Sequence, residues 1–130
     1  MKITQFTDYS LRLLLYLLRE RDRVVTVREV AEYYAISAEH LKKIVRQLVD
    51  LGHIQTVRGK HGGLRLARDP AEINLGTLFR EEESLDLLPC FDGDDACPLM
   101  SCRLRATVDE ALAAFLAVFD GKTLADLSGD

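Results

Sequence analysis

The fold of this protein is decided by residues 37–66, which read SAEHLKKIVRQLVDLGHIQTVRGKHGGLRL. Apolar side chains in the first half recur at the three- and four-residue steps of an amphipathic helix: Leu41, Ile44, Val45, Leu48 and Val49. Ser37 is a favourable N-cap for this helix, and Gly52 is a natural stop just after it. Residues 54–58 and 64–67 then predict two short strands, because the glycine-rich loop between them can turn a hairpin.

The region before residue 37 predicts two more helices. Residues 4–20 are apolar nearly all round at helical spacing, so this helix is expected to be mostly buried. Thr26 and Glu29 form a capping-box pattern at the start of a short second helix, which reaches Tyr34. Helix, short helix, tight turn, third helix and hairpin is the order of a winged helix-turn-helix.

The region after the hairpin predicts further helices. Asn74 can cap a short helix, and Thr123 can cap a last turn near the end of the chain. Residues 103–119 predict a long helix with one apolar stripe: Leu104, Val108, Ala111, Phe115 and Val118. Such a stripe fits a coiled coil with a partner helix and fits packing on the core of the same chain equally well.

Length, composition and charge bound the class of protein. The 130 residues fit one compact domain, and 48% hydrophobic and 29% charged residues are ordinary for a soluble protein. Residues 1–70 have 13 Lys and Arg against 8 Asp and Glu, whereas residues 71–130 have 4 against 13. We therefore expect a DNA-binding module at 1–70 and a cysteine loop with the long helix at 71–130. The apolar run at 13–18 is too short to span a bilayer and has no cleavage site after it, so we expect a cytoplasmic protein without a membrane anchor.

The third helix and the hairpin have the side chains that a DNA-binding surface needs. Polar and basic side chains outside the apolar stripe can contact base edges or phosphates, and glycines at the hairpin tip let the backbone approach a phosphate. We predict DNA contacts at Thr26, Arg28, Ser37, Glu39, His40, Lys42, Lys43, Arg46, Arg58, Lys60 and His61. The alternative is a merely solvated helix face, but the order of elements and the basic hairpin favour DNA. A phosphate-binding P-loop is not supported, because Gly59 and Lys60 are followed by His61 rather than Ser or Thr and the upstream glycine is missing.

All three cysteines, Cys90, Cys97 and Cys102, lie in one short acidic segment. Three clustered thiolates suit an iron–sulfur cluster. Buried core cysteines fit poorly among Asp, Gly and Pro, and a structural disulfide is disfavoured in the reducing cytoplasm, which leaves a thiol redox switch as an alternative. A zinc site is a further alternative, although there is no C-x-x-C pair and no histidine in the segment. The fourth ligand of an iron–sulfur cluster must then be another group, and the candidates are Asp92, Asp94, Asp95 or a distant residue.

Several motifs together resemble a known family, the winged-helix regulators that include the nitric-oxide-sensitive repressor NsrR and the iron–sulfur regulator IscR. The resemblance covers essentially the whole chain. It rests on residues 1–9 (MKITQFTDY), the hairpin at 57–64 (VRGKHGGL), the three-cysteine loop and residues 123–127 (TLADL). It implies a homodimer formed by the long C-terminal helices and an iron–sulfur cluster that tunes DNA affinity. In NsrR-like members an aspartate early in the first helix of the partner subunit can complete the cluster, and Asp8 has the matching position. Without the resemblance, Asp8 is a helix N-terminal charge favoured by the helix dipole.

Two departures from the family pattern concern the cysteine loop. The cysteines are less evenly spaced than in the family, but the reach from Cys90 to Cys102 is similar. IscR-like members place a histidine soon after the third cysteine, whereas this chain has Arg103 and Arg105 there. The resemblance is therefore to the NsrR-like branch, and Asp8 is the best candidate for the fourth ligand.

These observations predict a mainly α fold: a winged helix-turn-helix with a small β-hairpin wing and a long C-terminal dimerisation helix. The predicted protein is a homodimeric transcriptional repressor, not an enzyme, that binds a palindromic operator in double-stranded DNA. We expect it to hold an iron–sulfur cluster on Cys90, Cys97, Cys102 and Asp8, as 4Fe–4S rather than 2Fe–2S, and to respond to nitric oxide. The alternative function is a repressor without a cluster, which depends on thiol oxidation or zinc.

Overall fold

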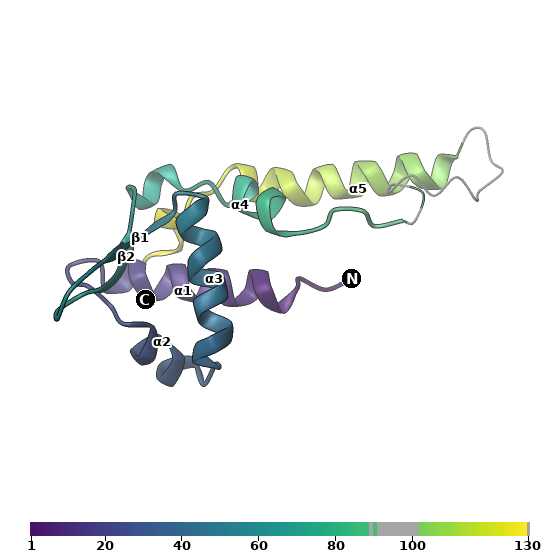
Figure 1. The fold of residues 1–130 in the computed structure, drawn as a ribbon. Helices are drawn as coiled ribbons and strands as arrows, with labels where there is room; N and C mark the ends of the chain where they lie inside the picture. Colours follow the sequence, from purple (N-terminus) through teal and green to yellow (C-terminus); the bar gives the residue numbers. More distant parts are fainter. Residues whose placement is uncertain (89, 91–101, 130) are drawn as a thin grey trace.

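A computed structural model describes residues 1–88, 90 and 102–129 of the chain (Figure 1). In this part of the chain the elements follow the order α1 Gln5–Arg19, α2 Val27–Tyr34, α3 Ala38–Asp50, β1 Ile54–Val57, β2 Gly63–Leu66, η1 Pro70–Glu72, α4 Leu75–Glu82, α5 Arg103–Asp120 and η3 Leu124–Leu127. The first three helices and the hairpin form a winged helix-turn-helix, as the sequence predicted. None of the helices in the described ranges combines the length and the apolar character that a membrane crossing requires.

The helices of the DNA-binding module begin where the sequence places cap residues. The side chain of Thr4 accepts a hydrogen bond from the Thr7 N–H at the start of α1, and Ser37 accepts one from the His40 N–H at the start of α3. The predicted capping box of α2 is confirmed, because Thr26 and Glu29 each bond the other's backbone N–H. Ala35 ends α2 in the left-handed conformation, with φ 54°, and so turns the chain into α3.

The hairpin is a two-stranded antiparallel sheet in which Ile54 pairs with Leu66 and Val57 pairs with Gly63. Each strand differs from the prediction by one residue at its ends, since Arg58 already belongs to the loop and β2 begins one residue earlier. A backbone bridge joins Val25 to Leu64 through two hydrogen bonds of 2.9 and 2.6 Å. The hairpin is thereby attached to the segment that leads into α2.

A single apolar core lies beneath α1, α2, α3 and the hairpin. Its buried side chains come from these elements and also from Leu78 of α4 and Leu124 of η3. The fully enclosed ones include Leu13, Leu14, Val25, Val30, Leu41, Ile44 and Leu48. The first helix was predicted to be mostly buried, and this is confirmed in part, because seven of its fifteen residues are buried. Burial of apolar side chains is the main stabilising contribution of such a core.

Helix α5 is attached to the module at one end only and extends away from it (Figure 1). Near its C-terminus, the Asn74 amide donates to the Asp120 carbonyl at 2.9 Å, and Arg80 forms a salt bridge with the Asp120 carboxylate. Phe79 of α4 packs between Phe115 and Phe119, with ring centroids 6.1 and 4.3 Å away. The opposite end of α5 begins at Arg103, directly after Cys102.

The apolar stripe predicted on the long helix is divided between two environments. Phe115 packs against α4 of the same chain, whereas Leu104 and Val118 are 63% and 60% exposed. The sequence left open whether the stripe packs on its own core or on a partner helix. Within one chain only part of it packs, because α4 is too short to cover an eighteen-residue helix.

Candidate DNA-binding surface and cysteine segment

The outer face of α3 is polar and projects from the module. Lys42, Lys43 and Arg46 are exposed, and the Lys42 ammonium lies 3.0 Å from the Glu39 carboxylate. Lys43 and Arg46 have no ion pair within the described part of the chain, so their charges are available to a phosphate. The buried face presents Leu41, which is completely enclosed.

Three predicted contact residues have a structural role as well. Thr26 and Ser37 use their hydroxyl oxygens to cap α2 and α3, so those oxygens are already engaged. Arg28 pairs with Glu32 at 3.0 Å across one turn of α2, with both side chains largely exposed. Such an exposed pair is weak, and a phosphate can replace the carboxylate.

His40 has an aromatic neighbour that the sequence did not reveal. Its ring makes an edge contact with the Tyr9 ring of α1 at a centroid distance of 5.2 Å. His40 is therefore half-buried and less free to reach a base than its neighbours on α3. No sequence signal identifies this contact, because the two residues come together only when α1 crosses α3.

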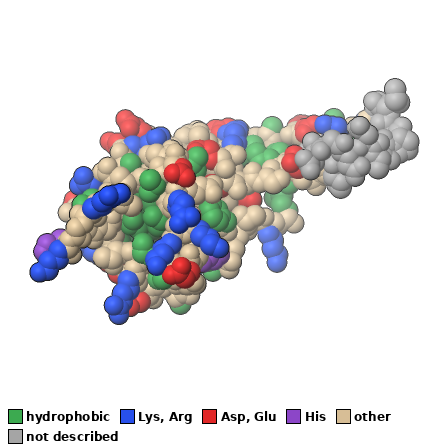
Figure 2. All heavy atoms as spheres, viewed as in Figure 1, with side chains coloured by type: hydrophobic (Ala, Val, Ile, Leu, Met, Phe, Trp, Pro, Cys, Tyr) green, Lys and Arg blue, Asp and Glu red, His purple; other side chains and the backbone are tan. Residues whose placement is uncertain are grey.

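The wing presents Arg58, Lys60 and His61 on an exposed loop. Gly59 has φ +110°, a conformation that side chains other than glycine rarely adopt, and a Cβ on Gly62 would overlap the Val57 carbonyl oxygen. The two glycines thus close the loop tightly. Figure 2 shows Lys and Arg side chains gathered over the wing and α3, with histidine at the wing end.

A charged network fixes α2 on α1. The Glu29 carboxylate accepts hydrogen bonds from the Arg23 guanidinium at 2.8 and 2.9 Å and from the Tyr16 hydroxyl at 3.0 Å. The Arg23 hydrogen bonds hold the pKa of Glu29 well below its ordinary value, at about 2. Glu29 is thus a structural anchor of the helix-turn-helix as well as part of the capping box.

The cysteine segment is described only at its two ends. Cys90 and Cys102 are free thiols of intermediate exposure, and Cys97 lies outside the described residues, as do Asp92, Asp94 and Asp95. The Cys102 sulfur caps α5 by accepting from the Arg105 N–H at 3.4 Å. Within the described ranges, no group of three or more His, Cys, Asp or Glu side chains is arranged so that it could hold a metal ion.

Asp8 lies on the first turn of α1, away from both described cysteines along the chain. Its carboxylate pairs with the Arg12 guanidinium at 3.1 Å, and both side chains are 44% exposed. The guanidinium also lies near the rings of Tyr9 and Tyr34, at 5.9 and 5.8 Å from their centroids. Asp8, Arg12 and both tyrosines line a hollow on the surface of α1 that is open to another molecule. The i,i+4 spacing of Asp8 and Arg12 is the signal that could have predicted the salt bridge.

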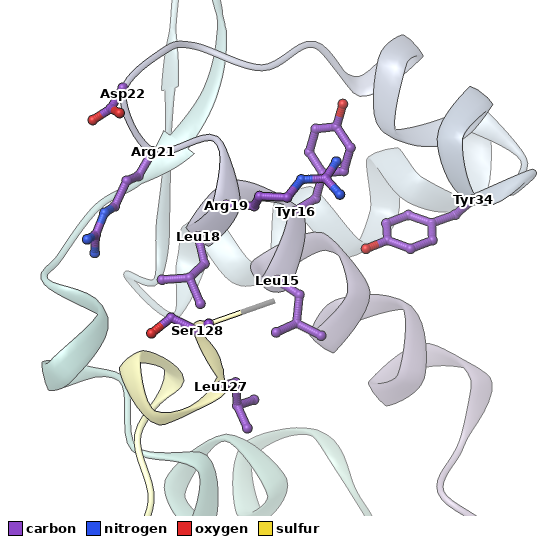
Figure 3. Close-up of a pocket in the computed structure, with 10 residues that line it drawn as sticks. Leu15, Tyr16, Leu18, Arg19, Arg21, Asp22, Tyr34, Leu127 and Ser128 are labelled. Atoms are coloured by element: carbon purple, nitrogen blue, oxygen red, sulfur yellow. The ribbon is translucent and has the colours of Figure 1, made fainter.

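A separate cavity of 450 Å³ lies where the end of α1 meets α2 and the C-terminal residues (Figure 3). Its lining includes Leu15, Arg19, Tyr34 and Leu127. The Arg19 guanidinium stacks between the rings of Tyr16 and Tyr33, at 4.9 and 4.8 Å. Among the described residues, none of those predicted to bind DNA or iron lines this cavity.

The arrangement of a polar α3 face beside a basic wing agrees with comparison to known proteins. Residues 3–130 match the Rrf2 family, which is described as an iron-dependent transcriptional regulator. The chain belongs to the Rrf2 family. It is 45% identical to the HTH-type transcriptional regulator NsrR of Shouchella clausii (strain KSM-K16), over 98% of this chain and 88% of that protein. It is 46% identical to the HTH-type transcriptional regulator NsrR of Geobacillus kaustophilus (strain HTA426), over 100% of this chain and 91% of that protein.

Solved structures share the fold of this Rrf2 protein. T. potens IscR superposes with a TM-score of 0.81 at 23% identity, over 98% of this chain and 85% of that chain. CymR, the global cysteine regulator of B. subtilis, superposes with a TM-score of 0.81 at 22% identity, over 98% of this chain and 95% of that chain. The predicted winged-helix fold is confirmed. The family and the named relatives are transcriptional regulators, so this protein is a DNA-binding transcriptional regulator and not an enzyme.

Proposed function

We propose that this Rrf2 protein is a cytoplasmic transcriptional repressor that responds to nitric oxide and holds an iron–sulfur cluster. The observation that carries the proposal is the placement of the three cysteines in one segment, between the DNA-binding module and the exposed helix α5. Identity above 40% to relatives named NsrR, over nearly the whole chain, supports the same function.

The donor set fits an iron–sulfur cluster. Cys90 and Cys102 are free thiols, and Cys102 lies directly before the first residue of α5. Cys97 supplies the third sulfur and Asp8 the fourth ligand, from a partner subunit. Asp8 suits this role because it is partly exposed and its bond to Arg12 is a surface salt bridge, which costs little to break. When bound, the group supplies iron that reacts with nitric oxide.

The residues of the chain would connect such a site to DNA. Exposed Leu104, Ala111 and Val118 form a line along α5 that a second copy of α5 can cover in a homodimer. If Asp8 of one subunit and the cysteines of the other held the same iron–sulfur cluster, α1 of the first subunit would be tied to the cysteine segment of the second. Each α3 packs on α1, so this connection would also constrain the spacing of the two α3 helices on a palindromic operator.

The first experiment is a visible absorption spectrum of anaerobically purified protein, with iron and sulfide assayed on the same sample. We expect an iron–sulfur absorption band that bleaches during a nitric oxide titration, together with a loss of operator affinity. A protein without iron and sulfide, even after anaerobic reconstitution, would contradict the proposal. A reversible disulfide or bound zinc in that protein would instead support the cluster-free alternative.

Asp8 is tested by comparing two variants that remove the same salt bridge. Asp8→Ala removes both the salt bridge and the carboxylate, whereas Arg12→Ala removes the salt bridge and keeps the carboxylate. If Asp8 is a ligand, only Asp8→Ala changes the absorption spectrum and accelerates cluster loss. Equal spectra in the two variants would exclude Asp8 as a ligand.

The DNA-binding surface is tested on α3. Arg46→Ala removes an exposed charge without touching the core, so we expect affinity for duplex DNA to fall about tenfold, with the salt dependence reduced by about one counterion. Arg21→Ala, an exposed charge beside the cavity of Figure 3, is the matched control and leaves the affinity unchanged. An Arg46→Ala protein with unaltered affinity would remove α3 from the interface.

A further inference from the structure

Three consecutive glutamates end α4 and connect it to the DNA-binding module. We call Glu81, Glu82 and Glu83 the glutamate clasp. Glu81 Oε1 lies 3.3 Å from His53 Nε2, in the turn that follows α3. Glu83 Oε1 accepts hydrogen bonds from the Thr4 N–H and hydroxyl at 2.7 and 3.0 Å, at the N-cap of α1. The glutamate clasp therefore contacts the N-cap of α1 and the turn after α3. In the sequence it comes shortly before the cysteine segment.

Glu82, in the middle of the clasp, has an unusual environment. Both of its carboxyl oxygens are inaccessible to solvent and neither has a hydrogen-bond partner among the described residues. The Ser10 hydroxyl of α1 faces this carboxyl without reaching the geometry of a hydrogen bond, and Ser10 is itself completely buried. A charged carboxylate in such a place would lose its hydration without compensation.

The charges around Glu82 also disfavour its ionised form. The groups that act on it are Glu81 and Glu83, both acidic and both on α4, while α1 contributes only the neutral Ser10 hydroxyl. In the described part of the chain, no lysine, arginine or histidine of α1, α3 or α5 pairs with it, and His53 is directed to Glu81. Burial, followed by the two neighbouring carboxylates, raises the pKa of Glu82 from its ordinary value to about 7.

We propose that Glu82 is a protonation-controlled latch: its neutral carboxyl group holds the last turn of α4 against α1, and its ionisation releases this turn and weakens DNA binding. On ionisation the proton passes to water, and the carboxylate must leave the α1–α4 contact to be hydrated. The Glu81–His53 and Glu83–Thr4 contacts are on the same turn, so they loosen with it. The module then loses its fixed orientation relative to α5.

The latch does not require iron, and its test uses the full chain with and without a cluster. Glu82→Gln keeps the shape of the neutral acid and cannot ionise. Glu72→Gln alters an exposed glutamate of η1 and is the matched control. The DNA is a duplex that the wild-type protein selects from a random library at pH 6. We would measure the affinity for this duplex from pH 6 to pH 8 at constant ionic strength. Dividing each wild-type dissociation constant by that of Glu82→Gln cancels the contribution of histidines on the DNA-binding surface.

We expect this ratio to be near one at pH 6 and to rise at least threefold by pH 8. When the dissociation constant of Glu72→Gln is divided by that of Glu82→Gln, the ratio should follow the same curve as the wild type. Amide exchange at residues 79–83 should lose protection above pH 7 in the wild type only. If Glu82→Gln folds poorly, Glu82→Leu, which is also neutral, replaces it. Parallel pH curves for the wild type and the neutral variant would overturn the latch. A rising ratio in protein that never binds iron would support the latch while contradicting the proposed cluster.

Discussion

Helix α1 buries seven of its fifteen residues, whereas α5, with eighteen residues, buries only Leu116. The two helices are similarly apolar in sequence, and residues 111–119 of α5 contain no charged side chain. The difference lies in what surrounds them, because α1 packs against α3, β2, η3 and α4, and α5 contacts mainly α4. The DNA-binding module is thus completed within one chain, while α5 has an apolar surface that one chain leaves exposed.

The largest expected effect is on the free energy of unfolding, when the same Leu→Ala substitution is made in the DNA-binding module and in α5. Leu48→Ala in α3 creates a cavity in a fully enclosed site, so the free energy of unfolding should fall by about 2–5 kcal/mol. Leu104→Ala in α5 removes a side chain that is 63% exposed and should cost well under 1 kcal/mol at a protein concentration too low for association. Urea denaturation measures both. Equal losses would mean that α5 is part of the same core.

The second prediction concerns the exposed line on α5 and rests on the proposed homodimer. Charges introduced by Leu104→Glu together with Val118→Glu would be buried without partners in a dimer, so the dimer dissociation constant should rise at least a hundredfold. Sedimentation velocity measures the association. The matched control is Asp109→Asn with Glu110→Gln, two exposed polar positions on the same helix. A double-glutamate variant that stays dimeric would place the interface elsewhere.

The third prediction contrasts two glutamates with opposite pKa shifts. Arg23 holds Glu29 ionised, with its pKa lowered to about 2, so the stability from this pair is complete above about pH 4.5 and is lost as the pH falls toward 2. Glu82 has a raised pKa of about 7, so its contribution declines as the pH rises from about 4.5 to 7. Glu29→Gln should cost about 1 kcal/mol at pH 7, and the difference from the wild type should shrink below pH 4. Denaturation curves between pH 3 and 8 test both signs.

The smallest effect expected is at the N-cap of α5. Cys102 caps this helix through its sulfur, and a serine hydroxyl can take over that role, so Cys102→Ser should change the free energy of unfolding by about 0.5 kcal/mol or less. The proposed cluster, in contrast, should be lost from this variant. Circular dichroism and an iron assay separate the two roles, and a variant that keeps its iron would remove Cys102 from the ligand set.

The clearest successes of sequence reasoning concern local features. The caps at Thr26, Ser37 and Asn74 and the glycines of the wing lie where the structure has them, because caps and tight turns depend on a few neighbouring residues. The exposed face of α3 follows from helical periodicity alone. The positions that contact DNA and iron stay predictions, and Cys97 lies outside the described residues.

The contacts that sequence reasoning missed join residues far apart in the chain. The run of glutamates that ends α4 has the sequence of a solvated helix end, yet packing of α4 on α1 removes the Glu82 carboxyl from water. The ring contact between Tyr9 and His40 likewise depends on how two helices cross. The sequence by itself determined which segments fold into helices, turns and a wing, since these follow from local chemistry and periodicity. Only the tertiary structure decided which polar groups are buried and which apolar face stays uncovered, because burial depends on what distant elements place around a side chain.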